Sequence, residues 1–215
     1  DSVLTDVGST KSDVVALIKD LKVKNPFIGG HPLAGSEKSG FEASRANLFE
    51  NAYYCLTPEE NTDKDSLNKL RNIVMDVGAI PIEMTPEEHD RVTAAISHVP
   101  HVVAASLVNL IDELDGPDNV MKTISAGGFK DLTRIASSSP SLWAGICLSN
   151  RDKVLETIDC FIERLKCFEN DLKNRNRERI EKFFISARDI RNSLSDRKSI
   201  FQKTYSILVD VDDRP

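Results

Sequence analysis

The sequence has few cysteines, and they lack any recognisable pairing. Its 215 residues contain four, none of them in a CxxC pair. Cys160 and Cys167 would lie on one helix face two turns apart, about 10 Å along the axis, which is too far for a disulfide. Scattered free thiols are typical of a reducing compartment, so we expect a cytoplasmic protein.

An excess of positive charge is also lacking, as are long apolar runs. Lys and Arg number 28 against 34 Asp and Glu, giving a net charge of −6, which argues against a nucleic-acid-binding protein. In the charged stretch 173–182 the arginines alternate with Asn and Glu, as on a solvated helix face. The longest apolar run, residues 102–111, is far too short to span a bilayer, so we expect no membrane segment.

What is present indicates an α/β region over residues 1–84. Short apolar runs alternate there with segments of helical periodicity, as in a mainly parallel sheet. The expected strands are Val3–Val7, Phe27-Ile28, Ala52–Leu56 and Ala79–Met84, and the expected helices are Ser12–Leu21 and Asp63–Val77.

From Thr85 onward the pattern is purely helical. Thr85 suits an N-cap and Pro86 the first helical position. Apolar residues then recur in steps of three and four, which predicts one long helix bent by Pro100. They are Val92, Ile96, Val99, Val103, Leu107, Leu110 and Leu114. Further helices are expected at 140–148, 151–172 and 177–194. The three together are too short to cover this stripe, so we expect a dimer.

The two ends look like strands that are cut. Residues 2–6 resemble a strand entered midway, and residues 206–211 a strand that begins just before the chain stops. A lone terminal strand has nothing to pair with. We therefore expect this chain to be an internal piece of a longer protein.

The histidines are the first candidates for chemistry. His31 lies in a glycine-rich segment, residues 29–40, directly after an expected strand. Loops at the carboxyl ends of strands form the ligand crevice of α/β sheets, so His31 is either an acid/base or a turn-ordering residue. His98 and His101 share a helix face downstream of His89. Because no third ligand completes a metal site, we expect the pair to line a pocket, one of them buried.

A second glycine-rich segment, residues 126–135, is expected to form a loop within the helical region. It contains Arg134, which suits recognition of a carboxylate, although a surface loop with incidental charges fits the spacing equally well. Trp143 is expected in the helical core. No GxGxxG occurs in the 215 residues, so no dinucleotide fingerprint can be assigned.

Four segments together resemble the prephenate dehydrogenase family of tyrosine biosynthesis. They are DVGSTK (6–11), GGHPLAGSEKSG (29–40), EHDRVTAAISHVPHVVAASL (88–107) and GGFKDLTRIASSSPSLW (127–143). They occur in the family's order, and the resemblance covers residues 1–172. It implies NAD-dependent oxidative decarboxylation of prephenate to 4-hydroxyphenylpyruvate. The family's usual initial GxGxxG unit is absent from these residues.

The resemblance also implies roles for individual residues. His31 would be the catalytic acceptor of the substrate hydroxyl, oriented by Ser9, which with Gly8 would also face NAD. Substrate would be bound by Arg134, His101, Ser36, Glu37, Asp90 and Lys130. Asp90 would hold Arg134 as an ion-pair partner, and Lys130 would reach a neighbouring subunit. No metal is implied.

The implied organisation has three parts. Residues 1–84 would be the remainder of a Rossmann-like NAD-binding domain, residues 85–205 a helical substrate and dimerisation domain, and residues 206–215 the start of an ACT domain. The resemblance implies a homodimer with tyrosine as feedback inhibitor. The 215 residues alone would be inactive, because the helix N-terminus that holds the pyrophosphate is not among them.

Three alternatives stay open at this point. The first is an arogenate dehydrogenase, which differs only within the pocket. The second is a non-catalytic helical dimerisation or regulatory module that keeps the fold. The third is another Rossmann-plus-helical dehydrogenase that uses a helix-borne lysine and asparagine. Asn109 lies on the long helix, but His31 speaks against this third reading.

Overall fold

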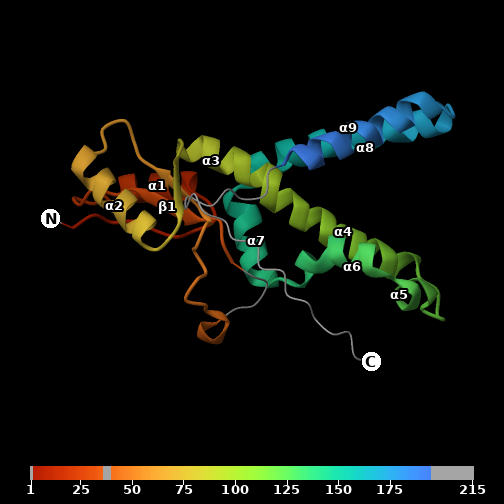
Figure 1. Ribbon diagram of the computed structural model, residues 1–215, viewed down its shortest axis with the longest axis horizontal. Coiled ribbons are helices and arrows are strands. Elements are labelled where there is room, and N and C mark those ends of the chain that lie inside the picture. The colour runs from red at the N-terminus through yellow and green to blue at the C-terminus, as the bar shows by residue number, and fades with distance from the viewer. Residues whose placement is uncertain (1, 36–39, 195–215) are drawn as a thin grey trace, which may run out of the picture.

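The computed structural model describes residues 2–35 and 40–194 (Figure 1). Ser36 and Glu37 lie outside the described residues, as does the strand expected at 206–211. Within them, an α/β part is followed by a helical part, as the sequence predicts.

The α/β part has a small mixed sheet. Helix α1 (Ser12–Asp20) precedes strand β1 (Gly29–Pro32), and helix α2 (Lys64–Asp76) connects β2 (Tyr53–Thr57) to β3 (Ile80–Glu83). The strand order is β1-β2-β3. β2 and β3 are parallel, but β1 pairs antiparallel with β2, with His31 opposite Cys55. The expectation of a mainly parallel sheet is therefore wrong at β1.

Strand β1 also lies further along the chain than predicted. Only an isolated parallel bridge, Leu4 to Phe27, forms in the segments expected as the first two strands. The two glycines that follow the strand expected at Phe27-Ile28 instead begin β1, where the chain passes too close to its neighbours for a side chain. A Cβ on Gly29 would lie 2.3 Å from Thr57 Oγ1, and one on Gly30 would lie 2.6 Å from the Asp6 carbonyl oxygen. His31 thus belongs to a strand.

The core of the α/β part lies between the sheet and α2. Its buried members are Ile28, Tyr54, Leu56, Leu70, Val74 and Ala79. Helix α2 begins one residue after its predicted start, because Asp63 is its N-cap and accepts a hydrogen bond from Ser66 N, at 2.9 Å. A carboxylate at this position satisfies a free N–H and complements the helix dipole.

The long helix forms as predicted, with an unexpected turn inside it. Helix α3 (Pro86–Thr93), a π-helical turn η2 (Ala94–His98) and helix α4 (Val99–Leu114) run on without a break. The wider turn ends two residues before Pro100, whose missing N–H and bulky ring disturb a regular α-helix. η2 packs against α8 (Arg151–Lys173), where Ala94, Val99 and Val154 form a second buried cluster.

By length and composition, the helix from Pro86 to Leu114 could cross a membrane, and it alone passes that test among the residues described. The core helix of a folded domain passes the same test. This one carries the fully buried His89 and the buried Asp90 and His98, all hydrogen-bonded to other parts of the chain. It therefore acts as the central helix of the fold.

The segment 126–135 is helical, contrary to the loop expected there. Helix α6 (Gly127–Thr133) continues into the 3-10 turn η3 (Arg134–Ser137), and both pack on α4. Neither glycine has a positive φ, so the helix forms despite their low intrinsic helix propensity. Two shorter elements are η1 (Phe41–Ala43) and α5 (Val120–Ile124).

The remaining helices match the predicted ranges closely. They are α7 (Pro140–Ser149), α8, and α9 (Arg177–Ser193). α8 and α9 form a hairpin that extends away from the sheet, while α7 lies between the sheet and α4 (Figure 1). The apolar stripe of the long helix is only partly covered, since Ile96, Leu110 and Leu114 are exposed. Much apolar surface thus faces outward in a single chain.

Candidate functional site

Three side chains form a hydrogen-bonded series where the sheet meets the long helix. His31 on β1 approaches His89 on α3, with 2.8 Å between His31 Nδ1 and His89 Nε2. His89 Nδ1 lies 2.8 Å from Asp90 Oδ1. His89 is fully buried, whereas His31 is half-buried. The series thus starts inside the protein and ends at a partly accessible imidazole.

The direction of these hydrogen bonds follows from the carboxylate. Burial by itself raises the pKa of Asp90, but hydrogen bonds from His89, Ser12 and the Lys11 backbone outweigh it, and the pKa is lowered. Ionised Asp90 only accepts, so His89 Nδ1 donates to it. In the tautomer that carries its proton on Nδ1, His89 Nε2 accepts from His31 Nδ1–H. The lone pair of neutral His31 is therefore on Nε2, which has no part in this series.

Asp90 also fixes the start of helix α1. Its two carboxylate oxygens accept the backbone N–H groups of Lys11 and Ser12, each at 2.8 Å. An anion there satisfies N–H groups that have no partner within the helix. The Asp90 carboxylate thus already has three donors, so its observed role is to cap α1 and orient His89.

Burial keeps His31 neutral. Desolvation, followed by the nearby His89, Lys11 and His98, lowers the pKa of His31 to about 3. The imidazole is therefore unprotonated over the whole neutral range, so its lone pair is available to accept a proton.

His98 and His101 occupy two sides of Trp143. His101 stacks on the indole with ring centroids 3.5 Å apart, and His98 meets it edge-on at 6.1 Å. The His101 Nδ1–H donates to the Ser97 carbonyl oxygen at 2.8 Å. His98 is buried, and its Nδ1 accepts from Asn150 at 3.1 Å. The prediction that one of the pair is a buried, hydrogen-bonded histidine thus holds for His98.

Arg134 begins η3 and is exposed, as is Lys130 on α6. The Arg134 charge is close enough to contribute to lowering the pKa of His101, after burial and against the Ser97 hydrogen bond. Arg134, His101 and Trp143 therefore share one region beside the long helix. Among the residues described, no group of three His, Cys, Asp or Glu side chains could hold a metal.

Gly8 and Ser9 form the turn that leads into α1. Gly8 is exposed and Ser9 half-buried. The Asp6 side chain joins this turn to β1, because its oxygens accept Gly8 N–H at 2.9 Å and Gly30 N–H at 3.0 Å. The turn assigned to NAD thus lies next to the strand that carries His31.

Sequence reasoning assigned no role to His89 and placed Trp143 in the core. The clearest sequence signal for His89 is its neighbour, because an adjacent Asp is a natural partner for a buried imidazole. No spacing rule reveals that His31, 58 residues earlier, completes the series.

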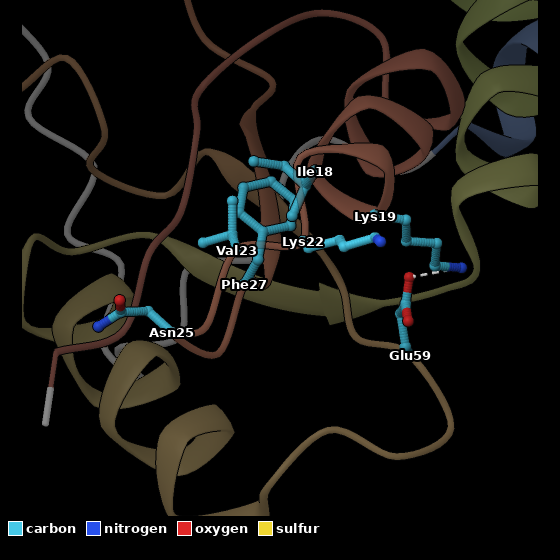
Figure 2. Close-up of a pocket in the computed structure, with 7 residues that line it drawn as sticks. All are labelled: Ile18, Lys19, Lys22, Val23, Asn25, Phe27 and Glu59. Carbon is cyan, nitrogen blue, oxygen red and sulfur yellow. Dashed lines mark ion pairs between the residues drawn. The ribbon is translucent and has the colours of Figure 1, made fainter.

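The surface pocket in Figure 2 is separate from this site. Its lining comes from the end of α1, the following loop and Glu59, which pairs with Lys19 at 2.8 Å. A second hollow, where α1 meets the start of α8, includes Asp90 on its wall. Neither pocket includes His31.

The buried histidines make a prediction for stability. Burial, the largest cause for both, lowers the pKa of His31 to about 3 and of His98 to about 4, from 6.5. Below pH 6.5 the unfolded chain binds these two protons and the folded chain does not, so stability falls as the pH is lowered. We expect a loss of up to about 1.4 kcal/mol per pH unit for each histidine, measured by urea unfolding between pH 7 and 5. His31→Asn should reduce this slope, and an unchanged slope would contradict the assignment.

Comparison with known proteins shows which family this chain resembles. The family model for the nucleotide-binding domain of prephenate dehydrogenase matches residues 1–83, and that for its dimerisation domain matches residues 85–186. The chain is 44% identical to prephenate dehydrogenase of Bacillus subtilis, covering 99% of this chain and 58% of that protein. The corresponding enzyme of Lactococcus lactis is 40% identical, with 98% and 58% covered.

Solved structures agree with these matches. Prephenate dehydrogenase of Aquifex aeolicus, in complex with hydroxyphenyl propionate and NAD+, superposes with a TM-score of 0.85 and 36% identity, covering 91% of this chain and 68% of that one. Arogenate dehydrogenase of Synechocystis gives 0.80 and 28%, with 90% and 70% covered. The chain spans 58% of the length of the two curated relatives. On both domain models and on these structures, the chain belongs to the prephenate dehydrogenase family.

Proposed function

We propose that this chain carries the substrate-side half of an NAD-dependent prephenate dehydrogenase, with His31 as the catalytic base. The observation that carries the proposal is the His31–His89–Asp90 series, which keeps a neutral imidazole with its lone pair on Nε2. A buried carboxylate behind two imidazoles stabilises the positive charge that forms when the outer one takes a proton. Both domain matches and the relatives' names support the reaction class.

Each step of the proposed reaction uses a particular group of this chain. His31 Nε2 takes the proton of the ring hydroxyl while hydride leaves the same carbon. The ring carboxylate is then lost as carbon dioxide, and the proton on His31 returns to the phenolate oxygen. NAD supplies the hydride acceptor when it is bound, and Gly8 and Ser9 are this chain's contribution to its nicotinamide end. Two substrate carboxylates need fixed cations, for which Arg134 is the candidate, with His101 beside it.

The remaining assignments are parts of the same proposal. Lys130 serves the carboxylate region from α6, with Ser36 and Glu37 contributing from the segment after β1. Asp90 acts through His89. The proposed organisation keeps the boundary near residue 84, the helical part to residue 205 and an ACT domain from residue 206. Tyrosine is the proposed feedback inhibitor, and the proposed location is the cytoplasm.

The experiment that tests this function is substrate oxidation. Purified full-length protein is incubated with NAD and either prephenate or arogenate, and NADH is followed at 340 nm. We expect prephenate to be preferred, as the Bacillus and Lactococcus names indicate. Preference for arogenate would favour the alternative that the Synechocystis neighbour represents, and no NADH from either would favour a non-catalytic module.

A homodimer is also proposed, through the helical part. Many large apolar residues on α4 to α6 and on α8 and α9 are exposed in the single chain. The family model that matches this part is that of the dimerisation domain. An obligate interface buries more than about 2,000 Å² in total. We expect light scattering at micromolar concentration to give twice the chain mass, and a monomer would contradict the proposal. Leu110→Glu on α4 should weaken the dimer, whereas Ile73→Glu on the exposed side of α2 should not.

A further inference from the structure

A buried lysine stands beside the proposed base without a role in the reaction. The Lys11 side chain is fully buried and forms an ion pair with Asp6, whose side chain is 22% exposed. Burial lowers the pKa of Lys11, opposed by Asp6 and by the charge of Asp90. Burying a cation is costly unless it is paired. A purely structural position would be served at lower cost by an apolar residue.

The ion pair connects the elements that surround His31. Asp6 accepts the backbone N–H groups of Gly8 and Gly30, on the turn and on β1. The Lys11 backbone N–H donates to Asp90 Oδ1, the same oxygen that His89 approaches. Asp6 and Lys11 therefore contact the Gly8–Ser9 turn, the strand of His31 and the far end of the histidine series.

The two glycines before His31 fit this arrangement. A Cβ on Gly29 would come within 3.0 Å of Lys11 Cδ, in addition to its clash with Thr57. A Cβ on Gly30 would crowd the Asp6 backbone and Thr5 Oγ1, at 2.6 and 2.8 Å. The glycines thus allow β1 to lie directly against the ion pair, and both charges of the pair act on His31.

Five groups of charged or titratable character face His31. They are His89 on α3, Lys11 at the start of α1, His98 on η2, Asp6 in the preceding segment, and Cys55 opposite it on β2. Of these, Lys11 and Asp6 act with opposite sign: Lys11 lowers the pKa of His31 and Asp6 raises it.

We propose that the buried Asp6–Lys11 ion pair is a positioning element for the base, holding the Gly8–Ser9 turn against the strand of His31 and placing a cation beside its imidazole. This inference rests on the proposed function of His31. In this role Lys11 and Asp6 act through His31 and the turn.

The test follows the His31 ring by NMR from pH 4 to 8 in the 215-residue chain, with His31→Asn to identify its signals. Because the pKa of His31 is about 3, the unmodified ring stays mostly unprotonated over this range, and a raised pKa appears as a new titration. The Lys11 cation repels a proton on His31, so removing it makes protonation of His31 easier. Lys11→Met should therefore raise the pKa of His31 by about one unit or more. Adding Asp6→Asn to Lys11→Met removes the anion and should lower it again. Lys19→Met, on the exposed side of the same helix, is the matched control and should leave it unchanged.

The outcomes separate this inference from the function it rests on. No shift in Lys11→Met, or a shift that Asp6→Asn fails to reverse, overturns the positioning role even if the full-length protein oxidises prephenate. The pKa of His31 can rise in Lys11→Met and fall again on adding Asp6→Asn while the full-length protein oxidises neither substrate. That result supports the action of the ion pair on His31 and overturns only the proposed function. Should Lys11→Met unfold, Lys11→Gln also removes the cation and must raise the pKa of His31, and no rise would overturn the inference.

Discussion

Replacing His31 with asparagine should lower the turnover of prephenate by about 10²–10⁴-fold, the usual contribution of a general base. The Michaelis constant should change little, because the lost proton transfer matters in the transition state and not in binding. Asparagine suits the test because its amide N–H can still donate to His89 Nε2, as His31 Nδ1 does. Steady-state kinetics on the full-length protein measure both constants.

The pH dependence gives this prediction a second measurement. The pKa of His31 lies at about 3 through burial and the neighbouring His89 and Lys11, so the base is neutral at and above neutral pH. In the unmodified protein, kcat/KM should fall only toward acid, as His31 becomes protonated, and the variant should lack this limb. Turnover that is unchanged in His31→Asn would leave His31 only a structural role, as the residue of β1 that hydrogen-bonds to His89.

Replacing Arg134 with glutamine should raise the Michaelis constant for prephenate by one to three decades, with a much smaller fall in turnover. Arginine stays charged at any working pH and offers a planar pair of donors to a carboxylate, which glutamine cannot replace. Losing such a charge-assisted contact weakens binding more than it slows the reacting bonds. The affinity for NAD should hardly change. Initial rates over a range of prephenate concentrations give the result.

Arg71→Gln is the matched control for this substitution. Arg71 lies on α2 and forms a surface ion pair with Glu83, a type of contact that contributes little to stability. Its replacement should leave both constants unchanged. If Arg134→Gln instead abolished turnover and left the Michaelis constant as it was, Arg134 would be a structural member of η3 and not a carboxylate anchor.

Periodicity and capping residues determined the helices. Thr85, Pro86 and the steps of three and four after them predict the long helix, which the structure shows from Pro86 to Leu114. Helices α1, α2, α7, α8 and α9 also lie within a residue or two of their expected bounds. These features are local: a cap acts within one turn, and an apolar face repeats within the helix that carries it.

Features that depend on contacts between distant segments could not be obtained in this way. Gly29 and Gly30 indicate a break in a strand when only their neighbours are considered, yet they lie in β1, which pairs with β2. Glycine is needed at both positions because Thr57 and Asp6 leave no room for a Cβ. The segment from Gly127 onward has poor helix formers but packs on α4 as a helix. In both cases tertiary packing outweighed local propensity.

The candidate site shows the same division between what the local sequence predicts and what tertiary contacts decide. The sequence by itself determined the family, through four ordered segments, and with it the residue types that the chemistry needs, above all His31 and Arg134. Only the tertiary structure decided that His89 and Asp90 stand behind His31, that Asp90 caps α1, and that Lys11 is buried beside the base. The physical reason is that charge and hydrogen bonding act through space, over distances set by packing, whatever the separation along the chain.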